Sequence, residues 1–161
     1  MDQNKFLSVG ADGETEDFYG NFLLSLNGTL LFGMNILFAW LGIGFYHDPA
    51  SGWKPLVVLI PMALFSFLFG GQLCYFSISE ENLEIRNHVF RWYRRKYALK
   101  DIEILIFERS LGRMSNSLRV KSAGSRPWSY FAGSLRYEDW YAFEKALKKR
   151  GIAVDNKLWG F

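Results

Sequence analysis

The stretch FLLSLNGTLLFGMNILFAWLGIGFY occupies residues 22–46 and contains no Asp, Glu, Lys, Arg or His. A hydrocarbon core is crossed by roughly 20 residues of α-helix, so this run is long enough to span a bilayer. A second run, PLVVLIPMALFSFLFGGQLCYF at residues 55–76, is equally uncharged. The polar segment HDPASGWK between the two runs contains Pro, Ser and Gly, which favour a turn. We therefore predict a transmembrane helical hairpin within residues 21–76.

Two other interpretations of these runs were weighed. A cleavable signal peptide needs a basic leader, but residues 1–20 are acidic, with a formal charge of −4. A pair of buried helices in a soluble protein would need other parts of the chain to cover roughly 45 apolar positions on every face, and the remaining residues are too few for that. The membrane hairpin is therefore the favoured interpretation.

Small and polar residues recur at helical spacing within both runs, every seven residues in the first and every four in the second. Such residues allow close helix approach and interhelical hydrogen bonds in lipid. An ion or substrate path through Asn27, Asn35 and Gln72 is the less favoured alternative, because no charged residue or His accompanies them. The predicted packing seam consists of Gly28, Asn35, Gly42, Ser66, Gly70 and Cys74.

Charge divides the chain into parts. Residues 77–161 hold 17 of the 19 Lys and Arg residues and 10 of the 16 Asp and Glu residues, for a formal charge of +7. Because basic residues crowd just beyond the second run, whereas the connecting loop offers Lys54, the positive-inside rule predicts that both termini are cytoplasmic. We expect an acidic tail at 1–20, the hairpin at 21–76, a cytoplasmic domain at 77–151 and a C-terminal tail at 152–161.

The second half of the chain changes to short segments typical of strands. CYFSISE and LEIRNHVF predict a hairpin, and segments at 94–99, 102–107, 118–121 and 128–131 follow between turns. Residues 137–150 lack Gly and Pro and place Trp140, Phe143 and Leu147 on one helical face. Acidic residues open this segment and basic residues close it, which complements a helix dipole. We predict an antiparallel sheet closed by a C-terminal helix, and therefore an α+β membrane protein.

This order of elements resembles the bacterial pleckstrin-homology-like membrane proteins, in which a transmembrane hairpin precedes a sheet-plus-helix domain. The similar stretches are YFSISEENLEIRN, YALKDIEILIFE, LRVKS and YFAGSLRYEDWYAFEKALKKRGI. The resemblance implies a partial β-barrel capped by its terminal helix, a location in the bacterial inner (cytoplasmic) membrane, and binding of proteins or membrane surfaces. It does not imply phosphoinositide recognition.

The basic run RWYRRK at residues 91–96 is the candidate contact with lipid or a partner. Alternation along a strand places Arg94 and Lys96 on one face and Arg95 on the other, which is not a formed phosphate cradle. A cationic patch beside an anionic leaflet and a solvated strand edge that deters pairing are equally favoured interpretations. The full set of candidate contact residues is Arg91, Arg94, Arg95, Lys96, Trp128 and Trp159, of which Trp128 is expected in the core or at an interface.

No catalytic motif is present in the sequence. His47 and His88 are predicted on opposite sides of the bilayer, and glycine-rich phosphate loops, GxSxG and HExxH are absent. We expect no enzyme activity, no metal site, no cofactor and no nucleic-acid partner.

Three functions remain open. The favoured one is a noncatalytic membrane-anchored scaffold or assembly subunit that presents its domain to a larger membrane complex, with membrane lipids and either a membrane protein or further copies of the chain as partners. An inner-leaflet sensor of anionic lipid is the alternative. A cryptic enzyme or small transporter is the least favoured.

Overall fold

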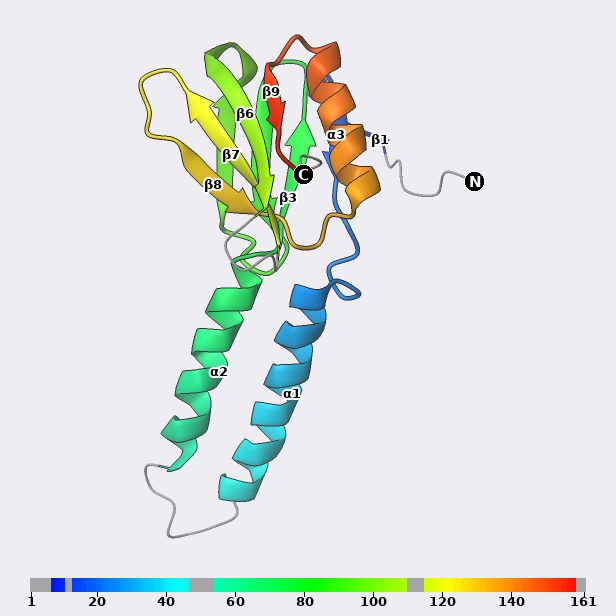
Figure 1. Cartoon of the computed structure of the whole chain (residues 1–161). Helices are drawn as coiled ribbons and strands as arrows, with labels where there is room; N and C mark the ends of the chain where they lie inside the picture. Colours follow the sequence, from blue (N-terminus) through cyan, green and yellow to red (C-terminus); the bar gives the residue numbers. More distant parts are fainter. Residues whose placement is uncertain (1–6, 11–12, 47–53, 110–114, 159–161) are drawn as a thin grey trace.

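The computed structural model describes residues 7–10, 13–46, 54–109 and 115–158. Two long apolar helices leave one end of a domain built from two sheets and a third helix (Figure 1). The helices are α1 (Leu26–Tyr46) and α2 (Lys54–Gly70). The fold is therefore α+β, as the change of pattern in the sequence predicts.

The first sheet runs in the order β1 (Leu7–Gly10), β2 (Gly13–Phe18), β3 (Cys74–Ile78), β4 (Asn82–Asn87) and β5 (Arg94–Ala98), and every pair in it is antiparallel. Neighbours β2 and β3 pair with Phe18 opposite Phe76, although 57 residues separate them in the chain. The helical hairpin is therefore an insertion between two adjacent strands.

The second sheet contains β6 (Ile102–Arg109), β7 (Asn116–Ser122), β8 (Trp128–Phe131) and β9 (Val154–Asn156) in the order β8-β7-β6-β9. A short 3₁₀ turn, Leu99–Asp101, connects β5 to β6. A bulge between Ile102 and Ile104 shifts the register, so Leu105 and Phe107 face the core while Ile104 and Ile106 are only partly buried. The bulge therefore breaks the regular alternation of side chains within the segment predicted as a strand at 102–107.

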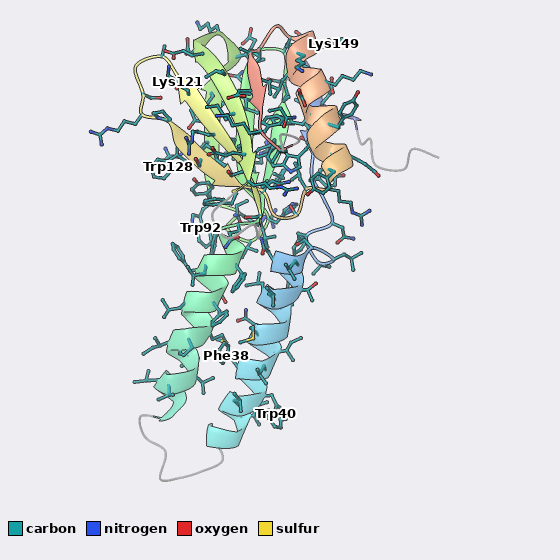
Figure 2. The ribbon with its side chains drawn as sticks, viewed as in Figure 1. Phe38, Trp40, Trp92, Lys121, Trp128 and Lys149 are labelled. Carbon is teal, nitrogen blue, oxygen red and sulfur yellow. The ribbon has the colours of Figure 1, made fainter. Side chains whose placement is uncertain are left out.

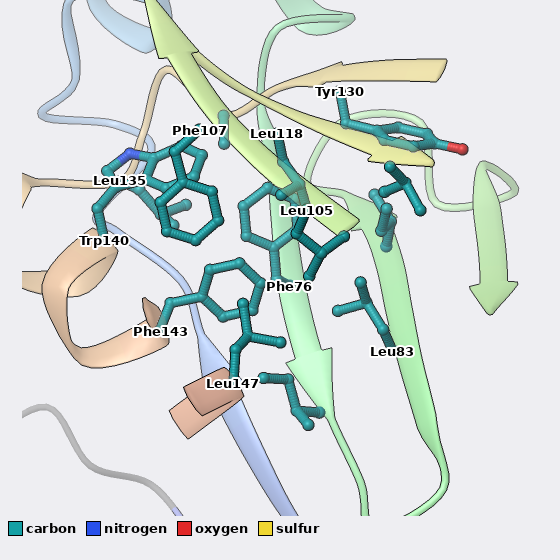
Figure 3. Packing of buried hydrophobic residues seen from close by; sticks show 14 of the residues in the cluster. Phe76, Leu83, Leu105, Phe107, Leu118, Tyr130, Leu135, Trp140, Phe143 and Leu147 are labelled. Atoms are coloured by element: carbon teal, nitrogen blue, oxygen red, sulfur yellow. The ribbon is translucent and has the colours of Figure 1, made fainter. Parts of the chain in front are cut away.

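Helix α3 (Tyr137–Lys149) packs across the space between the two sheets (Figure 3). The Asp139 carboxylate accepts a hydrogen bond from the Arg136 amide at 2.8 Å and so caps the first turn. Trp140 and Phe143 are fully buried, and the Phe143 ring stacks on Phe76 at 4.9 Å and on Phe107 at 5.5 Å between centroids. These aromatic rings join the helix and both sheets into one core.

Three expected boundaries need correction. The second helix ends at Gly70 rather than residue 76, because Cys74 begins β3, in which Cys74 and Phe76 are buried in the core. The segment expected as an acidic tail contains β2, which pairs with β3. The C-terminal tail contains β9, which pairs with β6 in parallel, and Leu158 is buried in the core.

Within the described part of the chain, one helical stretch, Leu26–Gly44 of α1, is long and apolar enough to cross a membrane. The apolar part of α2, Leu56–Gly70, is shorter than that criterion requires. Only 17% of the residues in the α1 window are buried within the chain. By length and composition, the expected second span is therefore weaker than its sequence run suggests.

Candidate functional site

A collar of buried amides joins the helices to the domain. Asn27, at the start of α1, is fully buried and donates through Nδ2 to the Gln72 side-chain oxygen at 3.3 Å. Ser115 donates to the same oxygen at 3.1 Å, and the Gln72 backbone oxygen accepts the Gly133 amide at 2.8 Å. A Cβ on Gly133 would lie 2.1 Å from Asn27 Nδ2, so this position has no room for a side chain. The contacts bind both helix ends to the base of the domain.

Asn87 forms the second half of this collar at the end of β4. Its Nδ2 donates to the Gly70 carbonyl at 2.8 Å, which satisfies an acceptor at the end of α2, and its Oδ1 accepts the Val89 and Phe90 amides at 2.8 Å each. The sequence contains a signal for this role. Leu83, Ile85 and Asn87 share the core-facing side of β4, and an amide at the third position breaks the apolar pattern.

His88 lies beside the collar between two aromatic rings. Its imidazole stacks on Phe22 at 5.0 Å and lies 4.5 Å from the Tyr75 ring. Its Nε2 is buried, without a hydrogen-bond partner among the described residues. Burial lowers the pKa of His88 from 6.5 to about 4, so the ring is neutral at neutral pH.

The helix pair brings together part of the expected seam. Ser66 Oγ donates to Asn35 Oδ1 at 3.0 Å, and Asn35 Nδ2 donates back to the Leu31 carbonyl. Gly42 faces Val58 of α2, where an added Cβ would make an ordinary contact at 3.7 Å.

The other expected seam residues lie outside the helix interface. An added Cβ on Gly28 would collide with the Phe22 carbonyl, and one on Gly70 would press on Val89 and Phe90 of the domain. Cys74 is buried in β3, where burial raises its thiol pKa to about 11. Helical spacing placed Cys74 on α2, but the helix has already ended there.

A polar groove of about 540 Å³ follows the outward face of the first sheet. The pairing register aligns Asp17, Ser77, Glu84 and Lys96 in one row across β2, β3, β4 and β5. Ser77 donates to Asp17, and the nearly buried Glu84 binds both Arg86 and Arg94. Sequence reasoning missed this row, because Asp17 was assigned to a tail. Its lining residues are Thr15, Asp17, Ser77, Ser79, Glu80, Glu81, Asn82, Glu84, Arg86, Arg94 and Lys96.

The basic run divides between this groove and the other face of β5. Arg94 and Lys96 line the groove, whereas Arg95 does not. Arg95 instead lies near Tyr93 and Tyr130, on the side where β5 and β8 are the edge strands of the two sheets. The side-chain alternation expected from the sequence thus separates two cationic surfaces.

Tyrosines bridge the edge strands β5 and β8 of the two sheets. The Tyr97 and Tyr130 hydroxyls are hydrogen-bonded, and Tyr93 contacts the Tyr130 ring and lies near Trp128. Burial raises the pKa of both Tyr93 and Tyr130, so these phenols stay neutral. The contacts hold the sheet edges together without a backbone ladder between them.

Two tryptophans are exposed on this side of the domain (Figure 2). Trp92 is 81% exposed and lies at the base, beside the end of α2. Trp128 is 60% exposed and lies farther from the helices. Trp128 is therefore a surface residue rather than a core residue, while Trp159 lies outside the described residues.

The described residues offer no cluster of three or more His, Cys, Asp or Glu side chains suited to a metal ion. Among the acidic residues, Glu80 and Glu81 are exposed at the end of the groove farthest from the helices, and Asp139 caps α3. His47 falls in the segment that the structure does not describe. The groove can thus form ion pairs and hydrogen bonds with a polar ligand.

No protein-family model matches the sequence, and comparison with curated protein sequences finds no match. Among solved structures, the chain is similar to one described as "Structure of the Spt16D Pob3N heterodimer". The identity is 15%, the TM-score is 0.41, and the match covers 55% of this chain and 49% of that chain. This chain therefore spans about half the length of that solved chain, and the proposals below rest on its own geometry.

Proposed function

We propose that the chain is a noncatalytic, membrane-anchored binding subunit with a pleckstrin-homology-like domain, which it presents to a larger complex in the bacterial inner membrane. The observation that carries this proposal is the apolar surface of the hairpin. Leucine and phenylalanine side chains on several sides of α1 and α2 are exposed, among them Leu37, Leu64 and Phe67. Without a membrane, these helices would leave a large apolar surface in water, which soluble monomers rarely do.

The strand pairing supports a double crossing. Because β2 precedes the hairpin and pairs with β3 directly after it, both strands lie in one sheet. If the helices enter lipid, the chain must therefore leave and return on the same side. The excess of Lys and Arg in the domain supports a cytoplasmic location for that side.

The collar supports a presenting role. Asn27 and Gln72 hold α1, and Asn87 holds the end of α2, so the domain is fixed directly on the helix ends rather than on a linker. Fixed geometry lowers the ordering cost of binding a partner whose own position is set by the membrane.

The groove on the first sheet is the surface that we assign to a protein partner. Its lining is polar, with exposed carboxylates of Glu80 and Glu81 at the turn farthest from the helices and the Arg86–Glu84–Arg94 cluster nearer to them. Such a charge arrangement favours a hydrophilic partner of complementary charge and sets its orientation.

Purification of the full chain from membranes in a mild detergent tests this proposal. We expect stoichiometric partner proteins to copurify with the wild type and to be depleted by Lys96→Glu, which reverses a charge in the groove. Lys145→Glu, on the exposed side of α3, is the matched control and should retain them. A chain that stays monodisperse in buffer without detergent would exclude the membrane anchor. Equal recovery of partner proteins by the Lys96→Glu and Lys145→Glu variants would exclude the groove as the partner-binding surface.

A further inference from the structure

The two helices differ in length, and the shorter one sets the depth of the domain. At 1.5 Å per residue, the 21 residues of α1 extend about 31 Å, whereas the 17 residues of α2 extend about 25 Å. A typical hydrocarbon core is about 30 Å thick. The described helical residues of α2 are shorter than such a core, and a short span is accommodated where the lipid thins locally or reaches the base of the domain.

Exposed apolar side chains continue beyond the helices at this end. Leu23 and Leu24 precede α1, and Leu24 is 73% exposed. Beside α2, the Phe67 ring contacts Phe90 at 5.9 Å, and Phe90 contacts Trp92 at 5.3 Å. The apolar surface of the hairpin therefore passes without a break onto the turn formed by residues 89–93, which we term the base turn.

The cations near the base turn differ in their partners. Arg94 binds Glu84 and is directed into the groove. Arg91 and Arg95 are exposed, and neither has a carboxylate within 4.0 Å among the described residues. The Arg95 side chain lies near the Tyr93 phenol, which is not an anion. No described carboxylate neutralises Arg91 or Arg95, so their charge can attract an anionic ligand beside an exposed tryptophan.

We propose that the base turn and the adjoining Arg95 of β5 form a third membrane contact, in which Trp92 inserts into the lipid interface while Arg91 and Arg95 bind the phosphates of anionic phospholipids. This inference rests on the proposed membrane anchor and identifies one of its partners. Tryptophan favours the headgroup level of a bilayer, and arginine pairs closely with phosphate. The domain then lies against the lipid surface, and Trp128, farther from the helices, stays in water.

Lipid quenching of tryptophan fluorescence tests the position of Trp92. The full chain is reconstituted into phosphatidylcholine and phosphatidylglycerol vesicles whose acyl chains carry bromine at shallow or deep positions. Subtracting the spectrum of Trp92→Phe isolates the signal of Trp92, and Trp128→Phe is the matched control. We expect Trp92 to be quenched by the shallow bromine and Trp128 to be unaffected. If Trp92 is not quenched, the inference is overturned. The same holds if cross-linking shows that a second copy of the chain covers the base turn and shields Trp92 from the lipid.

Spin-labelled lipids test the two arginines in the same vesicles. The wild type should retain labelled phosphatidylglycerol in preference to labelled phosphatidylcholine. Alanine at Arg91 and Arg95 should reduce this preference about five-fold for each residue, and added salt should weaken it. Alanine at Arg94 and Lys96 is the matched control and should leave the preference nearly unchanged. If the alanine variant of Arg94 and Lys96 loses the preference for phosphatidylglycerol as strongly as the variant of Arg91 and Arg95, the assignment of the phosphate contacts to Arg91 and Arg95 is overturned.

These outcomes separate the inference from the proposed function. If the chain does not enter vesicles, the membrane anchor itself is wrong. If the chain enters vesicles but Trp92 remains unquenched, the anchor stands and the base turn is not a lipid contact.

Discussion

The hairpin and the domain use the same apolar residue types in opposite ways. In the domain, Phe76 and Phe143 are fully buried against one another, whereas Phe67 of α2 points outward. Within the described parts of α1 and α2, Leu31 and Val58 are the large hydrophobic residues that are nearly completely buried. The domain carries its own apolar interior, but the hairpin needs its surroundings to provide one. The apolar type of a side chain therefore does not show whether the protein's own core or its surroundings cover that side chain.

Removal of the hairpin is the most severe test of this contrast. We expect a chain in which residues 21–71 are replaced by a short Gly/Ser turn to fold and remain soluble without detergent, because β2 and β3 are already adjacent. Circular dichroism and size-exclusion chromatography measure the outcome. The same chain carrying Trp140→Ala is the control and should lose its fold. Aggregation of the excised chain with Trp140 intact would show that the domain depends on the helices.

Truncation of a single apolar side chain should lower the unfolding free energy far more in the domain than in the hairpin. Trp140→Ala should destabilise the domain by about 3–5 kcal/mol, because it leaves a cavity between both sheets and α3. Phe67→Ala in α2 should change the unfolding free energy of the domain by less than about 0.5 kcal/mol. Urea titration in detergent, followed by near-ultraviolet circular dichroism, measures both. Equal losses of unfolding free energy in the two variants would contradict this difference between the domain and the hairpin.

The boundary between the regions should respond to acid through His88. Its pKa is about 4 in the folded chain and near 6.5 when unfolded, so the unfolded state binds the proton more readily between these values. Stability should be constant above about pH 6.5 and fall as the pH approaches 4, by about 1–2 kcal/mol after allowance for solvent screening. Urea titrations of the wild type and His88→Gln across this range measure the difference. A parallel pH dependence in both would exclude His88 as its source.

The smallest effect is expected within the hairpin itself. Loss of the Ser66–Asn35 hydrogen bond by Ser66→Ala should weaken helix association by about 0.6 kcal/mol, the average for such bonds in lipid. A double-mutant cycle with Asn35→Ala, measured by denaturation in detergent, isolates the coupling. Ala63→Gly, at an exposed position of α2, offers a control for general helix effects. Coupling near zero would mean that the bond does not stabilise the pair.

Sequence pattern predicted β3 to β8 and α3, because burial on one face gives each element a recognisable period, whereas β1, β2 and β9 were assigned to tails. Leu83 and Ile85 alternate as expected, and Trp140, Phe143 and Leu147 share a helical face. The pattern failed where two environments favour the same residues. The segment from Leu73 to Phe76 is apolar whether it continues a lipid helix or begins a buried strand.

Other features could not be predicted from the sequence pattern, because few of their residues are apolar. Strand β2 reads GETEDF, and Phe18 is its one aromatic contact with α3, so its charge indicated a tail. The groove depends on strand register, which aligns Asp17 with Ser77 across 60 residues. The collar likewise joins Asn27 to Gln72, and no local spacing reveals such a pair.

The pairing of β2 with β3 also orders events during synthesis. A ribosome completes β2 first, then both helices, and only then the strand that β2 joins. Strand β2 therefore cannot pair with β3 until both helices of the hairpin have been synthesised. The first sheet forms only after that point. Strand β9, which pairs with β6, is the last of the described strands to be synthesised. The second sheet is therefore completed only after both helices of the hairpin and α3 have been made.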